Sequence, residues 1–390
     1  MVYLDHAASS PLREVARDAW LAASRAAGNA SSVHGAGQAV RRVLEDARER
    51  IAQLLECEPI EVVFTGGGTE SINLALKGLW WSRPADADAV VLPDGEHHAT
   101  LDTVSWLTGQ GARVRPAPLD GLGRIAAPAF RRVLPGAAFA TALVANNEVG
   151  TVQDAAGLAA AAAEASVPLH LDAVAAVGHL PVSFSRWRGD ARGGSGLVAL
   201  SVSGHKFGAP VGTGVLVAAR SAALTPVLHG GGQQRGLRSG TPDVAGAAAM
   251  AAALGEAVSE LAAESARLRV LGERLVAGVR SAVPAAELLG DPVDRVPGNV
   301  HLLFPGASGE SLLFLLDRAG ISVSTGSACQ AGVTEPSHVV IALGRSERDA
   351  RSVLRMTLGR TSTVADVDAV LAALPDAYAR AAGSRTSPLS

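Results

Sequence analysis

Three segments of this 390-residue chain hold residue types that can do chemistry together. Between Thr65 and Thr69, three consecutive glycines separate an apolar run from a helical pattern, and such a turn presents backbone N–H groups to a phosphate. Asp172 ends a second apolar run, where open α/β sheets place ligand-contacting groups. Lys206 follows a third run among small residues, and a lysine with a lowered proton affinity can become a nucleophile. Each segment alone also fits an ordinary interpretation: a tight turn, a loop cap and a surface lysine.

In combination the three segments point to one cofactor. Pyridoxal phosphate requires a helix end for its phosphate, a carboxylate for its pyridine nitrogen and an amine for its aldehyde. The glycine turn, Asp172 and Lys206 supply these groups in that chain order. The conjunction is far more specific than any one of its parts, so it predicts a pyridoxal-phosphate site.

Short apolar runs alternate with helical patterns through the first two thirds of the chain. The runs predicted as buried strands are 61–64, 89–92, 142–145, 168–172, 197–202 and 214–218, and the predicted helices include 41–56, 71–80 and 155–165. Such alternation is typical of an α/β domain with a largely parallel sheet. We therefore predict a large cofactor-binding domain over residues 11–252.

The pattern changes after residue 252. A long helical stretch leads to 261–279, and strands at 300–304 and 321–324 mix with helices at 311–319, 346–351 and 364–374. Thr363 is expected to cap the last helix, with Asp366 three residues later. We predict a smaller α+β domain built from residues 1–10 and 253–383, followed by a disordered tail over 384–390.

The composition excludes several classes of protein. Apolar residues make up 48% of the chain and its net charge is −3, which argues against disorder and against a nucleic-acid-binding surface. The longest uncharged, mostly apolar run, 244–255, is shorter than the roughly 20 residues that span a membrane, and the N-terminus lacks the basic segment of a signal peptide. Cys57 and Cys329 form no zinc-binding or disulfide pattern, so we predict a cytoplasmic protein without a metal site.

Longer strings of residues then point to a family. With these motifs, which extend over nearly the whole chain, the sequence resembles the cysteine desulfurases of the NifS/IscS type, class-V aminotransferases among the fold type I pyridoxal-phosphate enzymes. The resemblance implies an aspartate-aminotransferase-like fold, whose large domain has a mostly parallel seven-stranded sheet between helices. The motifs are Tyr3–Ala8, Gly28–His34, Phe64–Ser71, Glu96–Ala99, Asn146–Gly150, Ser203–Lys206, His229–Gly232, Arg238–Pro242, Ser324–Cys329 and Leu354–Arg360.

The resemblance also assigns residues to the cofactor. It implies that Lys206 bonds to the cofactor and later moves protons at the substrate Cα, while Asp172 keeps the pyridine nitrogen protonated. It implies a homodimer, because Thr241 matches a residue that reaches the phosphate of the neighbouring subunit. The matches to the phosphate-binding positions within one chain are Gly68, Thr69, Ser203 and His205.

The reaction implied by the resemblance converts L-cysteine to L-alanine. Cys329 matches the nucleophile that receives the sulfur as a persulfide, on a loop expected to be mobile, and passes it to an acceptor protein. His97 matches an imidazole that stacks on the cofactor ring and shuttles protons, with His98 beside it at an expected strand end. Asn147 matches a contact to the cofactor's phenolic oxygen or the substrate carboxylate, and Arg355 matches a bidentate clamp for that carboxylate.

Two positions depart from the family, and the smaller departure is Gly68, where alanine is common and the change is expected to be harmless. Ala175 stands where the family usually has a glutamine that donates to the cofactor's phenolic oxygen, and its absence predicts an altered pH dependence of the cofactor rather than an inactive protein. Cys57, with no chemical group around it, is expected to be structural. A selenocysteine lyase or another β-lyase would share the same site, and a weakly active sulfur-transfer scaffold is a third possibility. The destination of the sulfur, whether iron–sulfur clusters, tRNA or another product, stays open.

Overall fold

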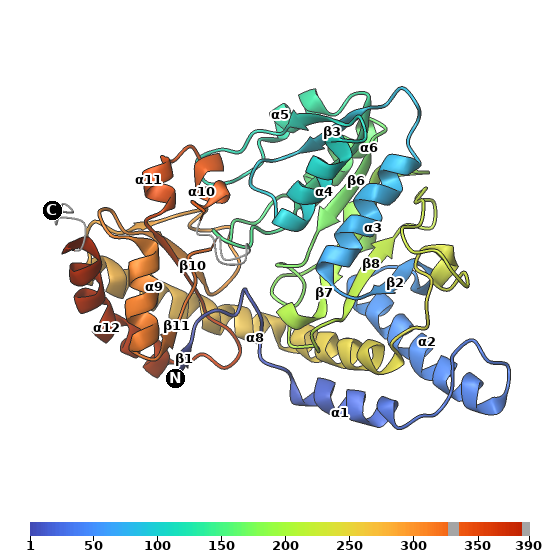
Figure 1. The fold of residues 1–390 in the computed structure, drawn as a ribbon, viewed down its shortest axis with the longest axis horizontal. Helices are drawn as coiled ribbons and strands as arrows, with labels where there is room; N and C mark the ends of the chain where they lie inside the picture. The colour runs from blue at the N-terminus through green and yellow to red at the C-terminus, as the bar shows by residue number, and fades with distance from the viewer. Residues whose placement is uncertain (327–334, 384–390) are drawn as a thin grey trace.

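The central feature of the fold is a seven-stranded sheet with the order β2-β8-β7-β6-β5-β3-β4 (Figure 1). In this computed structural model, which describes residues 1–326 and 335–383, β3 to β7 run parallel and β8 runs antiparallel to both of its neighbours. The predicted mostly parallel sheet of seven strands is therefore confirmed. The strands are β2 (Val62–Thr65), β3 (Ala89–Leu92), β4 (Arg113–Pro116), β5 (Ala137–Leu143), β6 (Pro168–Asp172), β7 (Gly196–Ser203) and β8 (Gly214–Ala218).

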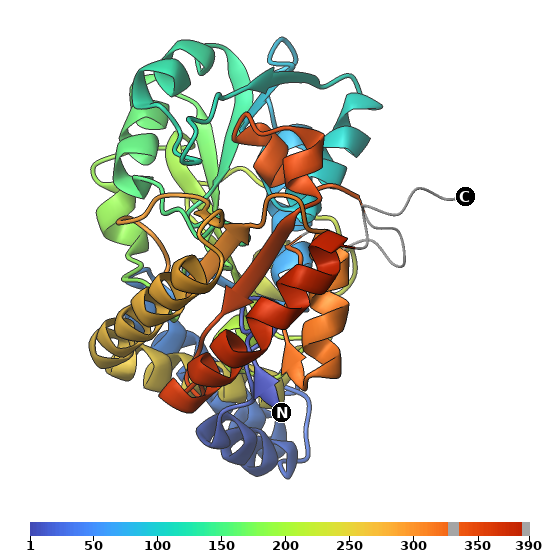
Figure 2. The ribbon, with the colours of Figure 1, turned by 90° about the vertical axis from the view of Figure 1, so that its left-hand side faces the viewer.

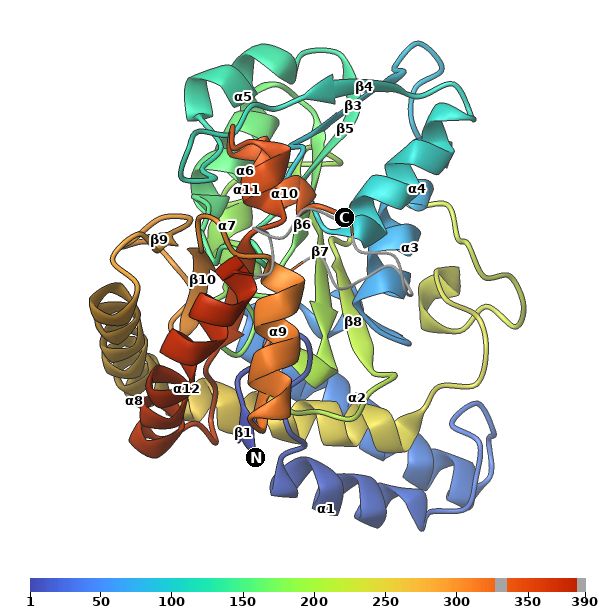
Figure 3. The ribbon, with the colours of Figure 1, turned by 60° about the vertical axis from the view of Figure 1, so that its left-hand side comes forward.

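Helices cover both faces of this sheet (Figure 3). On one face lie α3 (Gly68–Trp81) and α4 (His98–Thr108), and on the other lie α5 (Ala127–Val133), α6 (Ala155–Glu164) and α7 (Phe184–Arg188). Because both faces are covered, β5, β7 and β8 are buried along their whole length and read as continuous apolar or small-residue runs. The helices α1 (Glu14–Ser24) and α2 (Gly35–Leu55) pack against the start of the long helix α8 (Val244–Ala282).

Smaller sheets and their helices form a second part of the molecule (Figure 2), which has its own hydrophobic core. The strands β9 (Glu287–Leu288), β10 (Asn299–Leu303) and β12 (Val353–Thr357) are antiparallel, and β1 (Val2–Tyr3) pairs in parallel with β11 (Ile321–Ser322). The helices α9 (Gly309–Arg318) and α12 (Val364–Gly383) and the second half of α8 cover them. Two short helices, α10 (His338–Ala342) and α11 (Glu347–Ala350), complete this part.

The helix α8 connects the two cores. Its first half contributes residues as far as Ala257 to the core of the large sheet, and its second half contributes Leu268 onward to the smaller core. By length and composition α8 would be long and apolar enough to cross a membrane, but its packing into both cores accounts for its apolar residues. The domain boundary that we predict at residue 253 lies inside this helix and remains a prediction.

Several predicted elements match the structure, and others need correction. The strands at 89–92, 168–172 and 214–218 are confirmed to the residue. Thr363 and Asp366 also form the predicted cap, since each backbone N–H donates to the other's side chain. The strand predicted at 142–145 is misplaced: β5 runs from Ala137 to Leu143, and its alanines gave no clear strand pattern in the sequence.

Three further elements differ from the prediction for local reasons. The helix predicted at 41–56 begins at Gly35, where the His34 ring accepts from the backbone of Gly37. The edge strand β4 was not predicted, since it is mostly exposed and rich in arginine. The last helix continues past Pro375 to Gly383 because Ala377 and Ala381 stay buried on its inner face. The predicted mobility around Cys329 and the predicted disorder of 384–390 lie outside the described residues.

Candidate active site

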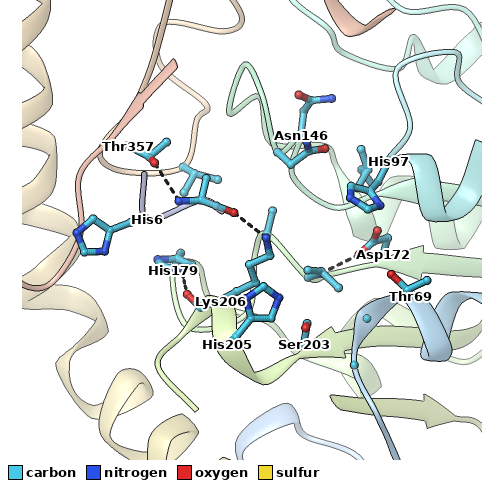
Figure 4. A pocket seen from close by; sticks show the side chains of 18 of the residues that line it. His6, Thr69, His97, Asn146, Asp172, His179, Ser203, His205, Lys206 and Thr357 are labelled. Atoms are coloured by element: carbon cyan, nitrogen blue, oxygen red, sulfur yellow. Dashed lines mark hydrogen bonds between the residues drawn. The ribbon is translucent and has the colours of Figure 1, made fainter. Parts of the chain in front are cut away.

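A cavity of about 380 Å³ lies where strand ends of the large sheet face the smaller core (Figure 4). The carboxyl ends of β2, β6 and β7 meet at one edge of the sheet, because β8 is antiparallel to both β2 and β7. The three segments found in the sequence follow these strands and so come together. The cavity is lined by eight of the predicted site residues, namely Gly68, Thr69, His97, Asn147, Asp172, Ser203, His205 and Lys206.

The glycine turn forms a cradle at the start of α3. Gly67 caps the helix with a φ of +147°, a conformation that favours glycine. A Cβ on Gly68 would lie 2.7 Å from Val174 Cγ2 and 3.2 Å from Ser203 Cβ, so only glycine leaves this space open. The free N–H groups at the start of α3, with the hydroxyls of Thr69 and Ser203 beside them, are the donors that a phosphate binds.

Asp172 ends β6 and is almost completely buried. Its Oδ1 accepts a hydrogen bond of 2.9 Å from the backbone N–H of Val174. Burial raises the pKa of this carboxyl to about 6, against the lowering effects of the Val174 hydrogen bond and of the positive charge of Lys206. A buried carboxylate of this kind favours a cationic partner, which a protonated pyridine nitrogen provides.

Lys206 lies in a 3₁₀ turn directly after β7. Its Nζ donates to the backbone carbonyls of Ala7 and Ala8, at 2.7 and 3.1 Å, so the N-terminal segment closes over it. The main-chain carbonyl of Lys206 accepts hydrogen bonds from the Ser10 hydroxyl and from His179 Nε2. The lysine is thereby fixed from both parts of the molecule, with its amine at the cavity.

His97 sits at the start of a helix, not at the end of a strand as predicted for the His97–His98 pair. It is the N-cap of α4, and its Nδ1 accepts from the backbone N–H of Ala99 at 3.0 Å. Burial, followed by the positive charge of Lys206, lowers the pKa of His97 to about 4. The ring is therefore neutral near pH 7 and carries its proton on Nε2.

Asn147 and Arg355 lie next to each other on the side of the smaller core. The Asn147 Oδ1 is buried and has no hydrogen-bond partner among the described residues. Arg355 donates to the Asn147 carbonyl at 2.8 Å and pairs with Asp5 at 3.0 Å. Arg355 is not among the described residues that line the cavity, and its guanidinium already holds one carboxylate, that of Asp5.

The structure does not bring Thr241, another predicted residue, into the cavity. Thr241 is exposed and does not line it. Cys329 lies outside the described residues. For Cys57, burial followed by the charges of Glu61 and Glu58 raises the thiol pKa to about 12, and this thiol is free and packs against the large core.

Several residues that line the cavity were not predicted as site residues, and two of them lie in the motifs quoted above. His6 and Thr357 belong to the strings Tyr3–Ala8 and Leu354–Arg360, and both are buried at the cavity. His179 and Asn299 also line it, and the Oδ1 of Asn299 is buried without a partner among the described residues. No residue spacing marked these four side chains, because they reach the site through tertiary contacts.

The residues present fit pyridoxal phosphate. The Gly68 cradle leaves room that any side chain would fill, and Asp172 is a buried anion facing the same cavity as the Lys206 amine. The buried Oδ1 of Asn147 has no hydrogen-bond partner among the described residues, so it can accept a hydrogen bond from a bound group in the cavity. Phosphate, pyridine nitrogen and aldehyde each have a matching group on this chain.

Comparisons with known proteins agree on a family. Residues 2–370 match the family described as Aminotransferase class-V. The chain is 49% identical to the IscS-like cysteine desulfurase of Mycobacterium tuberculosis, over 98% of this chain and 97% of that protein. It is 36% identical to the cysteine desulfurase IscS of Methanosarcina thermophila, over 96% and 91% of the two chains.

Solved structures agree with the sequence matches. A NifS-like protein superposes with a TM-score of 0.88 at 29% identity, covering 97% of this chain and 99% of that one. The protein SspA, solved in complex with cysteine, superposes with a TM-score of 0.78 at 29% identity, covering 92% and 99%. The predicted aspartate-aminotransferase-like fold of the pyridoxal-phosphate cysteine desulfurases is thereby confirmed.

Proposed function

The chain belongs to the class-V aminotransferase family as a pyridoxal-phosphate-dependent cysteine desulfurase of the NifS/IscS type, and we propose that Lys206, His97 and Cys329 are its catalytic residues. The observation that carries the assignment is the convergence at one cavity of the glycine cradle, the buried Asp172 and the Lys206 amine. Each of these groups would bind a different part of the cofactor: its phosphate, its pyridine nitrogen or its aldehyde.

The cofactor-holding residues follow from the cavity. When bound, pyridoxal phosphate supplies an aldehyde that captures an amino group and a ring that accepts the electrons of the Cα–H bond. The start of α3, with Gly68, Thr69, Ser203 and His205, would hold the phosphate. Asp172 would keep the ring nitrogen protonated, and Lys206 would bond to the aldehyde.

Two residues of the cavity move protons. Lys206 takes the Cα proton of the bound amino acid, because its amine is the nucleophilic nitrogen at the cavity. His97 is neutral at physiological pH, so its ring can first accept a proton and then, as the imidazolium, give that proton to a departing group. Asn147 and Arg355 bind the substrate carboxylate; for this, Arg355 shares its guanidinium with Asp5.

The sulfur passes to Cys329. Its thiolate attacks the sulfur of L-cysteine, the bond between that sulfur and Cβ breaks, and a new S–S bond leaves Cys329 as a persulfide. The carbon fragment gains the protons and departs as L-alanine, so no outside oxidant or reductant is consumed. An acceptor protein then takes the outer sulfur by thiol exchange. The support is the motif Ser324–Cys329. Its first three residues, to Gly326, belong to the described part of the chain, and Cys329 lies three positions further along the sequence.

The assembly and location are part of the same proposal. We expect a cytoplasmic homodimer in which Thr241 of one protomer contacts the phosphate held by the other. The exposure of Thr241 and its absence from the lining of its own chain's cavity support this arrangement. The acceptor serves either iron–sulfur cluster assembly or tRNA thiolation. Mixing the ³⁵S-labelled persulfide form with each purified candidate protein identifies the acceptor as the one that takes up the label.

Two variants test the catalytic assignment. The variant C329A should bind the cofactor and stay yellow, yet form no protein persulfide and little alanine from L-cysteine. The variant K206A should lose both the yellow absorbance and turnover. Turnover of L-cysteine by C329A at the wild-type rate would overturn the role of Cys329, and a yellow, active K206A would overturn the role of Lys206.

A further inference from the structure

The N-terminal segment supplies hydrogen-bond acceptors to the Lys206 amine (Figure 4). The carbonyl oxygens of Ala7 and Ala8 lie 2.7 and 3.1 Å from Lys206 Nζ. An ammonium group is a donor with no acceptor capacity, so two carbonyls aimed at Nζ favour its protonated form over the neutral amine. These contacts come from main-chain atoms, and something else must hold the segment in place.

Thr357 holds that segment from the smaller sheet. Its Oγ1 accepts a hydrogen bond of 2.9 Å from the backbone N–H of Ala7, which is drawn in Figure 4. Thr357 is the last residue of β12 and is almost completely buried, and its main chain also bonds to Leu4 and His6. At the other end, the Ser10 N–H donates to the His205 carbonyl. The segment is thus tied down on both sides of the lysine.

We propose that Thr357 is a positioning residue for the proton transfer at the substrate Cα. By holding the Ala7 N–H, its hydroxyl aims the carbonyls of Ala7 and Ala8 at Lys206 Nζ. The inference rests on the proposed function, in which Lys206 is the base. When Lys206 takes the Cα proton, the C–H electron pair stays with the substrate and the amine becomes an ammonium that the two carbonyls stabilise.

The other groups around Lys206 do not replace this contact. Burial is the main cause that lowers the pKa values of His97 and His205 to about 4 and also lowers that of His179. These rings therefore place no charge beside the amine near pH 7. Asp172 is an acidic group whose charge acts together with that of Lys206, and we assign it to the cofactor nitrogen. The two carbonyls are contacts through which a distant side chain can change the basicity of the amine.

Exchange of the Cα proton of L-alanine in D₂O measures this step directly. Alanine carries no sulfur, so its exchange, followed by NMR, does not require Cys329. In T357V, which removes the acceptor for the Ala7 N–H, the maximal exchange rate should fall about 10-fold or more, because hydrogen bonds to charged groups are among the stronger ones. The alanine concentration at half-maximal rate should change less than about two-fold, since uniform binding is untouched.

Matched variants separate positioning from a general loss of structure. T357S keeps the hydroxyl and should exchange within about two-fold of the wild type. T103V removes the hydroxyl of another buried threonine, which bonds to Ala99 in α4 away from the cavity lining, and should also match the wild type. T357A removes the same oxygen without extra apolar bulk and must show the same loss as T357V. Wild-type exchange in either T357V or T357A overturns the inference.

The apoprotein gives a readout that does not depend on the bound cofactor. The chain has only two lysines, Lys77 and Lys206, so trace acetylation of the apoprotein can be read by mass spectrometry with Lys77 as the internal reference. Weaker carbonyl contacts leave more of the Lys206 amine neutral. Its acetylation relative to Lys77 should therefore be faster in T357V than in T357S, and equal rates would contradict the proposed contact.

The outcomes distinguish this inference from the proposed function. Loss of exchange in K206A together with normal exchange in T357V would reject only the role of Thr357. Normal exchange in K206A would reject Lys206 as the base and the proposed function with it. Loss in both K206A and T357V, with rescue in T357S, supports both.

Discussion

Glu96 predicts an unusual dependence of stability on pH. Its side chain is almost fully buried at the end of β5, where Oε1 accepts from the Leu143 N–H at 2.9 Å and Oε2 has no partner among the described residues. Burial raises the pKa of Glu96 to about 8, and the nearby charge of Asp172 adds to the effect. The folded protein thus holds this carboxyl neutral at pH 7, whereas the unfolded chain ionises it near pH 4.5.

The sign and size of the effect follow from these two values. Because the folded pKa is above the unfolded one, the contribution of Glu96 to wild-type stability falls as the pH rises from about 4.5 to about 8 and is constant above that. Each pH unit within this range costs about 1.4 kcal/mol, so the loss between pH 5 and pH 7 is about 2.5 kcal/mol. E96Q keeps an acceptor for the Leu143 N–H and cannot ionise, so it is spared this loss.

The difference between wild type and E96Q isolates Glu96 from all other titrating groups. We expect the free energy of unfolding of E96Q, relative to that of the wild type, to rise by about 2.5 kcal/mol from pH 5 to pH 7. Urea unfolding of both apoproteins, followed by tryptophan fluorescence, measures it. A difference that stays constant over this pH range would refute the buried, neutral carboxyl.

Three further predictions concern cofactor and substrate binding. G68A should weaken cofactor binding by about 10-fold or more, since the new Cβ would lie 2.7 Å from Val174 Cγ2, and titration of the apoprotein with pyridoxal phosphate checks it. A175Q should shift the pH dependence of the cofactor absorbance by adding a donor at the cavity, so an unchanged titration would count against that position. R355K should raise KM for L-cysteine by about 10-fold with a smaller effect on kcat, because a lysine cannot hold both Asp5 and a substrate carboxylate bidentately; an unchanged KM would remove Arg355 from substrate binding.

The sequence predicts the architecture well where each segment decides its own structure. The strand at 168–172 and the cap formed by Thr363 and Asp366 depend on local apolar runs and local hydrogen bonds, and both are confirmed. The alanine-rich strand β5 was misplaced because alanine has little preference for strands, and its burial comes from neighbouring strands and helices.

The site residues also fall into two groups: those that local sequence patterns predict and those that only tertiary packing brings to the site. Gly68, Asp172 and Lys206 were found because each follows a strand whose direction brings its end to one edge of the sheet. The contact from Thr357 through Ala7 to Lys206 joins residues 350 and 199 positions apart, which no periodicity in the sequence reveals. Such contacts require the packing of the smaller core against the large sheet.

The central claim is that the amine of Lys206 bonds to pyridoxal phosphate. Reduction of the yellow protein with sodium borohydride fixes that bond, and peptide mass spectrometry then locates the added mass on one of only two lysines. We predict that the added mass is on Lys206 and that Lys77 is unmodified. A modified Lys77 with an unmodified Lys206, or a yellow protein with no modified lysine, would contradict the account.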